Sequence, residues 1–168
     1  MDKVPGYSPA QIALHWTVVV LVAFQFLAHD AIATAWQSFL SDEAAPARGT
    51  ALTYMHVAAG TLVLVLALAR IYLRATRGAP PPPEDEPRLM QLSAELIHGL
   101  IYALLLLLPV TGMAAWFLGV GPAGTLHGWM TNVLLGAIAL HIAGALFQHF
   151  VRRSEVLIRM FRPQRSER

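Results

Sequence analysis

Charged residues are missing from three long stretches of this 168-residue sequence, and these gaps constrain the fold more than any other feature. No Asp, Glu, Lys or Arg occurs between Lys3 and Asp30, between Arg48 and Arg70, or between Glu95 and Arg152. The hydrocarbon core of a bilayer needs about 20 apolar residues of helix, so each of the first two gaps can hold one transmembrane helix and the third can hold two. The chain is therefore predicted to be an integral membrane protein of the all-α class.

A turn-forming run, Gly119–Gly124, interrupts the third gap and allows the chain to reverse there. The gap is thereby divided into two membrane-length parts. The four helices are expected near residues 9–29, 51–73, 93–118 and 125–151.

The segments around these helices have simpler signals. Ser8 and Gln11 form a Ser-x-x-Gln capping box at the start of the first helix. The Pro-rich segment 74–92 is predicted to be an extended connector. The tail, residues 152–168, is predicted to include a short helix on the membrane surface. No second folded unit is indicated, so residues 1–168 are expected to form a single domain.

The twelve basic residues are divided unequally between the two sides of the predicted bundle. Only Arg48 falls on one side, whereas the others fall on the side of the N-terminus, the connector 74–92 and the C-terminus. Basic residues accumulate on the cytoplasmic side of membrane proteins, so both termini are expected in the cytoplasm. The basic character then reports topology and contact with membrane lipid, and it gives no support to nucleic-acid binding.

The chain contains no cysteine, which excludes iron–sulfur clusters and the covalent attachment of c-type haem. Histidine is the remaining candidate ligand for a non-covalent haem b. Ionisable residues within a membrane are costly to bury and indicate function. All seven histidines lie in or at the ends of predicted helices, at His15, His29, His56, His98, His127, His141 and His149.

The spacing of the histidines indicates two haem sites. His127 and His141 are 14 residues apart on the fourth helix, so at about 100° and 1.5 Å per residue they share one face about 21 Å apart. In an antiparallel arrangement His15 can reach the level of His141 at the inner side, and His56 can reach the level of His127 at the outer side. His29, 14 residues after His15, competes with His56 as the outer ligand. Haem with two histidine ligands favours electron transfer over binding of oxygen.

Arg70 follows His56 by the same 14-residue spacing, which places it on the same helix face at the inner side. An arginine there can pair with a haem propionate, because its planar guanidinium suits a carboxylate. It can equally serve as an anchor that extends to the lipid headgroups. Both interpretations of Arg70 remain open at this point.

A longer pattern runs through the whole chain. In order it comprises Tyr7–Trp16, Met55–Gly60 followed by Arg70 and Arg74, the Pro-rich connector, His98–Tyr102 with Leu108–Gly112, and finally His127 and His141. On this pattern the chain resembles the bacterial cytochrome b561 family of small di-haem membrane cytochromes.

This resemblance implies a four-helix bundle in the bacterial inner membrane that holds two haem b groups. It implies His15, His56, His127 and His141 as the iron ligands, rather than His29, and electron exchange with ubiquinone. One branch of the family is described as oxidising superoxide at the outer face, and other relatives are membrane subunits for hydrogenases or formate dehydrogenases. Fold and cofactor transfer more safely across a family than substrate does.

The outer face carries little positive charge for an anionic substrate such as superoxide. It offers Arg48 alone, against Asp30, Asp42 and Glu43. Because positive charge attracts anions, this balance argues against superoxide as the electron donor.

The third helix supplies no haem ligand in this scheme, yet it carries Glu95, His98 and Tyr102 on one face near the inner side. Quinone reduction requires protons, and these three groups can bind quinone oxygens and relay protons. The alternative is a polar helix entrance with Tyr102 at the aromatic belt of the membrane.

Three functions are therefore considered. The first is a quinone-linked oxidoreductase that takes electrons from a donor at the outer face. The second is a cytochrome subunit that carries electrons for a redox partner protein. The third is a haem-free proton channel or small transporter. The short loops favour the first function, because a partner protein needs more exposed surface for docking.

Overall fold

The computed structural model describes residues 6–41, 49–83 and 85–163. Within these ranges all regular structure is helical, which confirms the all-α prediction. The helices are α1 (Pro9–Leu27), α2 (His29–Leu40), α3 (Ala51–Arg77), α4 (Arg88–Leu118), α5 (Gly121–Phe150) and a short 3₁₀ helix (Ile158–Met160).

Four of these helices, α1, α3, α4 and α5, are long and apolar enough to cross a membrane, as predicted. Only 17% to 28% of the residues in their most apolar windows are buried inside the protein. Apolar side chains on the remaining faces point outward, which is expected when the surrounding solvent is lipid. The start of α1 also follows the prediction, because Ser8 and Gln11 exchange both hydrogen bonds of a capping box.

Several boundaries differ from the sequence-based prediction. α4 begins at Arg88 and not near residue 93, directly after Pro87, so the extended connector is shorter than 74–92. α5 begins at Gly121 and not near residue 125, because Pro122 lies in its first turn, where proline needs no backbone donor. Gly119 ends α4 in the left-handed conformation with φ 67°. The predicted loop between the first two spans contains an additional helix, α2.

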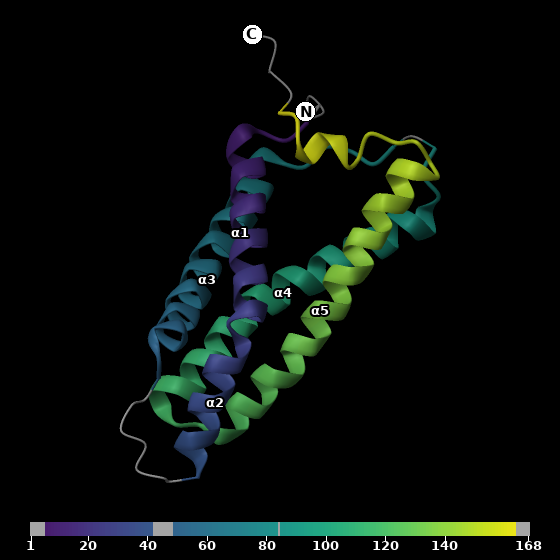
Figure 1. Ribbon diagram of the computed structural model, residues 1–168. Coiled ribbons are helices and arrows are strands. Elements are labelled where there is room, and N and C mark those ends of the chain that lie inside the picture. The colour runs from purple at the N-terminus through teal and green to yellow at the C-terminus, as the bar shows by residue number, and fades with distance from the viewer. Residues whose placement is uncertain (1–5, 42–48, 84, 164–168) are drawn as a thin grey trace.

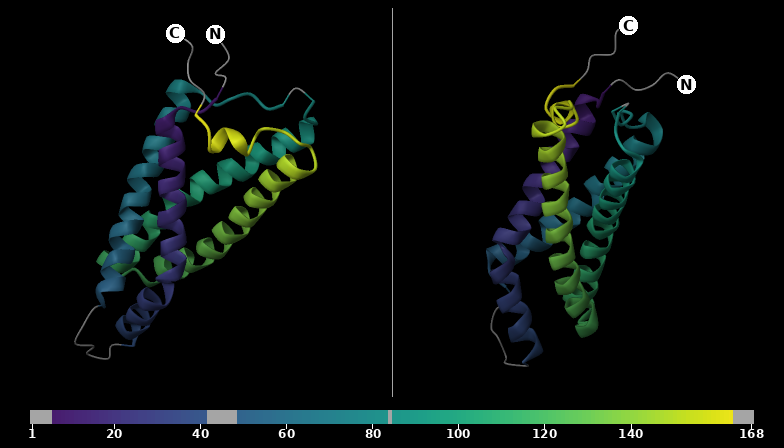
Figure 2. Two further views of the ribbon diagram at one scale, coloured as in Figure 1. Left: turned by 45° about the horizontal axis from the view of Figure 1, so that its top comes forward. Right: turned by 90° about the vertical axis from the view of Figure 1, so that its right-hand side faces the viewer.

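The helices pack in the order α1, α3, α4, α5, and α2 packs mainly against α3. Figure 1 shows α1 and α3 side by side on one flank and α5 on the other, and between them α4 crosses from the α5 side to the α3 side. α5 diverges from α1 toward the end that holds both chain termini. We call this the terminal end, and we call the opposite end, with α2 and the α4–α5 turn, the far end. The left view of Figure 2 shows the same divergence of α5 from α1.

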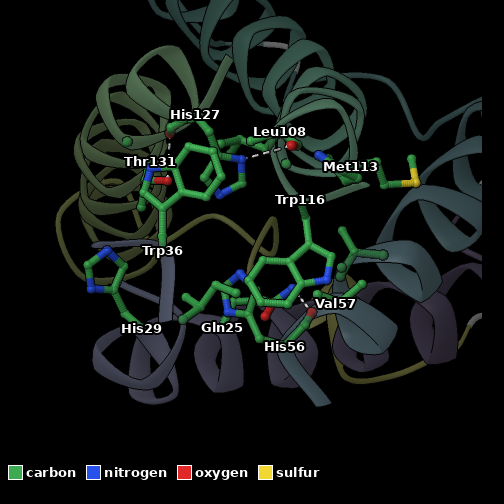
Figure 3. Close-up of a pocket in the computed structure, with 18 of the residues that line it drawn as sticks. Gln25, His29, Trp36, His56, Val57, Leu108, Met113, Trp116, His127 and Thr131 are labelled. Atoms are coloured by element: carbon green, nitrogen blue, oxygen red, sulfur yellow. Dashed lines mark hydrogen bonds between the residues drawn. The ribbon is translucent and has the colours of Figure 1, made fainter. Parts of the chain in front are cut away.

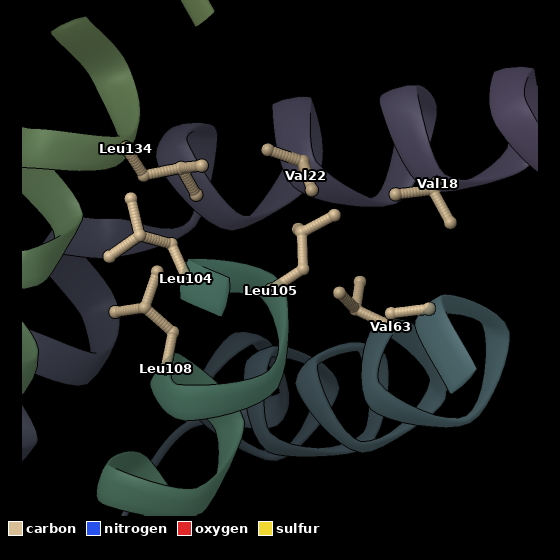
Figure 4. Packing of buried hydrophobic residues seen from close by; sticks show 8 residues of the cluster. Val18, Val22, Val63, Leu104, Leu105, Leu108 and Leu134 are labelled. Carbon is tan, nitrogen blue, oxygen red and sulfur yellow. The ribbon is translucent and has the colours of Figure 1, made fainter. Parts of the chain in front are cut away.

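The hydrophobic core lies between these two ends, where all four long helices approach one another (Figure 4). On each helix the core residues occupy the middle of the span. The buried cluster comprises Val18, Val22, Val63, Ala67, Leu104, Leu105, Leu108 and Leu134. Along α5, Leu134 separates His127 from His141, so the core is an apolar layer between two groups of histidines.

Loops close the terminal end. The connector after α3 is held to the segment after α5 by Arg159, whose Nη1 donates to the carbonyl of Pro81 at 2.9 Å, and by an ion pair of 3.0 Å between Arg152 and Asp85. Gln148, buried on α5, donates to the Glu86 carboxylate. The predicted surface helix of the tail is a 3₁₀ helix of three residues, Ile158–Met160.

Candidate functional site

Two histidines from different helices face each other at the far end. His56 lies in the second turn of α3 and His127 in the second turn of α5. Their ring centres are 6.5 Å apart, with 61° between the ring planes. Figure 3 shows both side chains directed into the same pocket. Both are half-buried, so the sequence-predicted outer pair is brought together.

A second pair lies at the terminal end, with nearly the same geometry. His15 on α1 and His141 on α5 have ring centres 6.4 Å apart and 61° between the ring planes. α1 and α5, which carry these two histidines, diverge toward this end (Figure 1). α5 therefore contributes one histidine to each pair, as the 14-residue spacing of His127 and His141 predicts.

The ring separation fits two imidazoles that share one metal ion. Bonds of about 2 Å from a metal to each ring nitrogen, plus about 1 Å from nitrogen to ring centre on both sides, give roughly 6 Å. Among the residues that the structure describes, no three His, Asp or Glu side chains gather to hold a bare metal ion. Pairs of histidine suit haem, because the porphyrin supplies the other four ligands.

The far-end pair borders a cavity of about 360 Å³ with a mostly apolar lining. Its wall contains two buried polar atoms that have no hydrogen-bond partner among the described residues, namely Nδ1 of His56 and Oε1 of Gln25. Gly112 also lines it, and a Cβ added there would lie 3.1 Å from Cε1 of His127. An apolar cavity with two facing imidazoles fits a flat apolar group such as a porphyrin.

The ring of His127 is fixed by its neighbours on α4. Its Nδ1 donates to the carbonyl of Leu108 at 2.9 Å and lies 3.4 Å from the Thr111 hydroxyl (Figure 3). This hydrogen bond selects the tautomer whose Nε2 is free to bind a metal. The backbone of α4 thus orients a side chain of α5.

His29, the competing outer ligand, occupies a different environment. It begins α2, its side chain is 52% exposed, and its Nδ1 is 3.6 Å from the Asp30 carboxylate. It borders the cavity, and Figure 3 places it to one side of His56 and His127. The ring that faces His127 is that of His56.

The terminal-end pair has polar neighbours on α3 and α4. Arg70 lies within electrostatic range of both His15 and His141, and its Nη2 donates to the Tyr102 hydroxyl at 3.5 Å. The ring centre of His98 is 4.9 Å from that of His141, and its Nδ1 contacts the Ala94 carbonyl at 2.7 Å.

The structure thus brings His98 and Tyr102 to the terminal-end pair, together with Arg70. Glu95, the third residue of the predicted quinone group, is exposed. The predicted charges at the outer face fall mainly on Asp42, Glu43 and Arg48, which lie outside the described residues.

Sequence reasoning missed several residues at these sites. Gln25 donates its amide to the carbonyl of His56 at 3.0 Å, and Trp16 places its ring 5.3 Å from that of His15. Trp36 on α2 lines the far-end cavity. Gln25 had a signal, since it is a polar residue within an apolar span, whereas nothing in the sequence indicates which residues Trp16 and Trp36 contact.

Comparison with known proteins identifies the family of this chain. The sequence profile of the family described as prokaryotic cytochrome b561 matches residues 6–163. A cytochrome b562 of Cereibacter sphaeroides is 34% identical, over 98% of this chain and 100% of its own length. Cytochrome b561 homolog 1 of Escherichia coli and a probable superoxide oxidase CybB of Yersinia pestis are each 30% identical, over 95% of this chain and 98% of theirs. This chain therefore belongs to the prokaryotic cytochrome b561 family and is a multi-pass membrane cytochrome, a class whose cofactor is haem b.

Proposed function

We propose that this chain is a di-haem b oxidoreductase of the bacterial inner membrane that passes electrons between a donor at the far end and quinone at the terminal end. One observation carries the proposal: two histidine pairs, at opposite ends of the bundle, have ring separations of 6.4 and 6.5 Å and the same interplanar angle. Two packing histidines have no reason to repeat this geometry, whereas two ligand pairs do.

In this proposal His15 and His141 hold one haem iron, and His56 and His127 hold the other. Haem b held by two histidines would supply reversible one-electron transfer. The chain's own residues orient the ligands: Leu108 fixes the tautomer of His127 through a hydrogen bond of 2.9 Å. The apolar core between the ends excludes water from the middle of the bundle.

The distribution of arginine supports a cytoplasmic location for the terminal end. All arginines of the described ranges lie at the terminal-end side of the core, on α3 from Arg70 onward, at the start of α4 or after α5. By the positive-inside rule this end faces the cytoplasm. The far end then faces the periplasm, where an external donor would arrive.

Quinone is proposed to bind at the terminal end, beside His98 and Tyr102. The Nδ1 of His98 donates to the Ala94 carbonyl, so its Nε2 is free to take up a proton and then donate it to a quinone oxygen. The Tyr102 hydroxyl accepts from Arg70, which leaves its own proton free to be donated. Glu95 is exposed one turn before His98 and is suited to take protons from the cytoplasm.

The proposed electron donor acts at the far end. One relative carries the name probable superoxide oxidase, which makes superoxide the first donor to test. A cytochrome subunit needs an exposed surface on which its partner protein can dock. Trp36, an aromatic residue of the 30–50 segment that could contribute to such a surface, is half-buried against Gly124. This packing favours an enzyme that acts alone.

The test uses the purified full-length protein in detergent. We expect two extractable haem b groups per chain, a sharp α band of b type after dithionite reduction, and quinone reduction by superoxide above the uncatalysed rate. Folded protein without haem would contradict both cytochrome functions, and proton flux in vesicles would then support a channel. Loaded protein that reduces quinone only with a co-purifying dehydrogenase would support the subunit function.

A further inference from the structure

Three arginines converge on Tyr7 at the terminal end. Arg70 and Arg74 come from α3 and Arg159 from the 3₁₀ helix, and all three lie within electrostatic range of the Tyr7 phenol. Burial raises the pKa of Tyr7 above its usual 10.0, although the arginines oppose this shift. The phenol is therefore a neutral hydrogen-bond donor in a strongly positive environment.

These arginines lack the negative partners that such a cluster normally has. Among the described arginines only Arg152 forms an ion pair with a carboxylate, that of Asp85. Nη1 of Arg70 and Nε of Arg159 are buried and have no hydrogen-bond acceptor within the described part of the chain. A buried charged donor without a partner is costly, so the cluster is incomplete without an anion that carries acceptor oxygens.

Each of these two arginines is already positioned by its other donors. Arg70 donates through Nη2 to Tyr102, and its guanidinium lies 5.8 Å from the centre of that ring. Arg159 donates through Nη1 to the carbonyl of Pro81. The unpaired nitrogens therefore belong to side chains held in place, which suits a preformed binding site.

The segment that carries Arg159 is attached beside His15. The indole of Trp16 donates to the carbonyl of Met160 at 2.8 Å, and its ring is 4.8 Å from that of Phe161. The same indole is 5.3 Å from the ring of His15. Arg70 lies within electrostatic range of His15 and His141. Arg159 lies within electrostatic range of Tyr7, as Arg70 does, and its segment is attached to Trp16, the neighbour of His15.

We propose that Arg159 and Arg70 form a two-arginine clamp for the propionates of the haem held by His15 and His141, and that the segment 151–163 is a strap closed by that haem. The inference rests on the proposed function, because it requires a haem at this pair. Haem b carries two propionate carboxylates, and arginine matches a carboxylate with two parallel donors. Arg159, from the tail, supplies a second donor that approaches from a different direction than Arg70 on α3.

The first test compares Arg159→Gln with the matched control Arg162→Gln, an exposed arginine in the same segment. Both are purified as full-length, haem-loaded protein in nanodiscs of neutral phosphatidylcholine. For Arg159→Gln we expect one of the two haems to be lost to a haem-accepting protein roughly tenfold faster, since one charged hydrogen bond is removed. Its reduction potential should fall, because a positive charge that favours the reduced state is gone. The control should match the wild type in both.

The second test measures the strap directly in the wild-type protein. Cleavage by trypsin after Arg159 is followed by mass spectrometry for protein from haem-fed and from haem-starved cells. We expect protection of this bond in the loaded protein and faster cleavage in the haem-free protein. This readout needs no variant, so a failure of Arg159→Gln to fold does not leave the clamp untested.

The outcomes separate the clamp from the function on which it rests. Wild-type protein without haem would contradict the proposed function itself. Two bound haems with identical behaviour of Arg159→Gln and Arg162→Gln, or equal cleavage with and without haem, would overturn the clamp alone. An effect of Arg159→Gln that appears only in anionic phosphatidylglycerol nanodiscs would identify a lipid headgroup as the anion and also overturn it.

Discussion

The two ends of the bundle present the same pair of side chains in different surroundings. At the far end His56 and His127 border an apolar cavity, and a backbone carbonyl fixes one ring. At the terminal end His15 and His141 are accompanied by a third histidine, His98, and by arginines and tyrosines. The ring separations differ by only 0.1 Å.

Because the two histidine pairs have equal geometry, a functional difference between the ends is expected to come from their surroundings. Positive charge near a redox centre favours its reduced state, and the described arginines lie on one side of the core. The proposed site at the terminal end is therefore expected to have the higher reduction potential, which would draw electrons toward quinone.

The largest expected effect tests which histidines form the far-end pair. His56→Ala should reduce the haem content from two groups per chain to one, because one of two axial ligands is removed. His29→Ala should keep both, since His29 is exposed and its ring does not face His127. Extraction and counting of haem measures this. Loss of haem from His29→Ala alone would reverse the assignment.

Replacement of His98 tests whether proton chemistry is confined to the terminal end. His98→Gln should lower the rate of quinone reduction about 100-fold, because a proton donor is lost, while both haems stay bound. Stopped-flow kinetics and a haem count on the same sample give both quantities. If one haem disappears instead, His98 competes with His15 as a ligand of the iron at His141, and the symmetry between the ends is broken.

A smaller effect is expected from crowding the far end. Gly112→Ala places a methyl group against the ring of His127, and such overpacking costs about 1–3 kcal/mol. Far-end haem should bind more weakly by this amount, with the terminal-end haem unchanged. Gly99→Ala on the same helix is the control, since a Cβ there meets no atom within 4 Å. Equal haem retention in the two variants would show that the far-end cavity accommodates an added methyl group at residue 112 without loss of haem affinity.

The smallest expected effect is a pH dependence of stability that arises from Tyr7 at the terminal end. Because burial raises the pKa of Tyr7 from 10.0, folding disfavours the phenolate, and stability is lost as pH rises above that value. Thermal unfolding of the wild type should therefore shift downward more steeply than that of Tyr7→Phe above about pH 10. Tyr72→Phe, at an exposed tyrosine of α3, should follow the wild type. Identical curves for all three proteins would place Tyr7 in contact with solvent.

Much of the fold could be predicted from the sequence because a membrane allows few alternatives. The absence of charged residues between Lys3 and Asp30 indicates a transmembrane helix without any knowledge of tertiary contacts. The helix α2 was missed because its pattern is short: Ile32, Trp36 and Phe39 recur at helical spacing in a segment that also holds polar residues. Pro87 and Pro122 mark the starts of α4 and α5. The sequence alone does not distinguish these positions from loops, in which proline is equally common.

The sequence predicts which histidines lie on one face of a helix, but it only partly predicts which histidines of different helices meet. The spacing of His127 and His141 on one helix follows from helix geometry alone. The approach of His98 to His141, and of Arg159 to Tyr7, depends on how far α5 diverges from α1 and on the path of the tail. Such contacts between distant segments have no periodic signal in the sequence.

The place of α5 in the chain has a consequence for biogenesis. This helix is the last of the four spans to leave the ribosome, and it carries one histidine of each pair, His127 and His141. The partner histidines on α1 and α3 are synthesised earlier, and each pair lacks its second histidine until α5 is inserted. Under the proposed ligation a chain truncated before α5 would assemble neither centre, so loading of both haems would report that the fourth span has been synthesised and inserted.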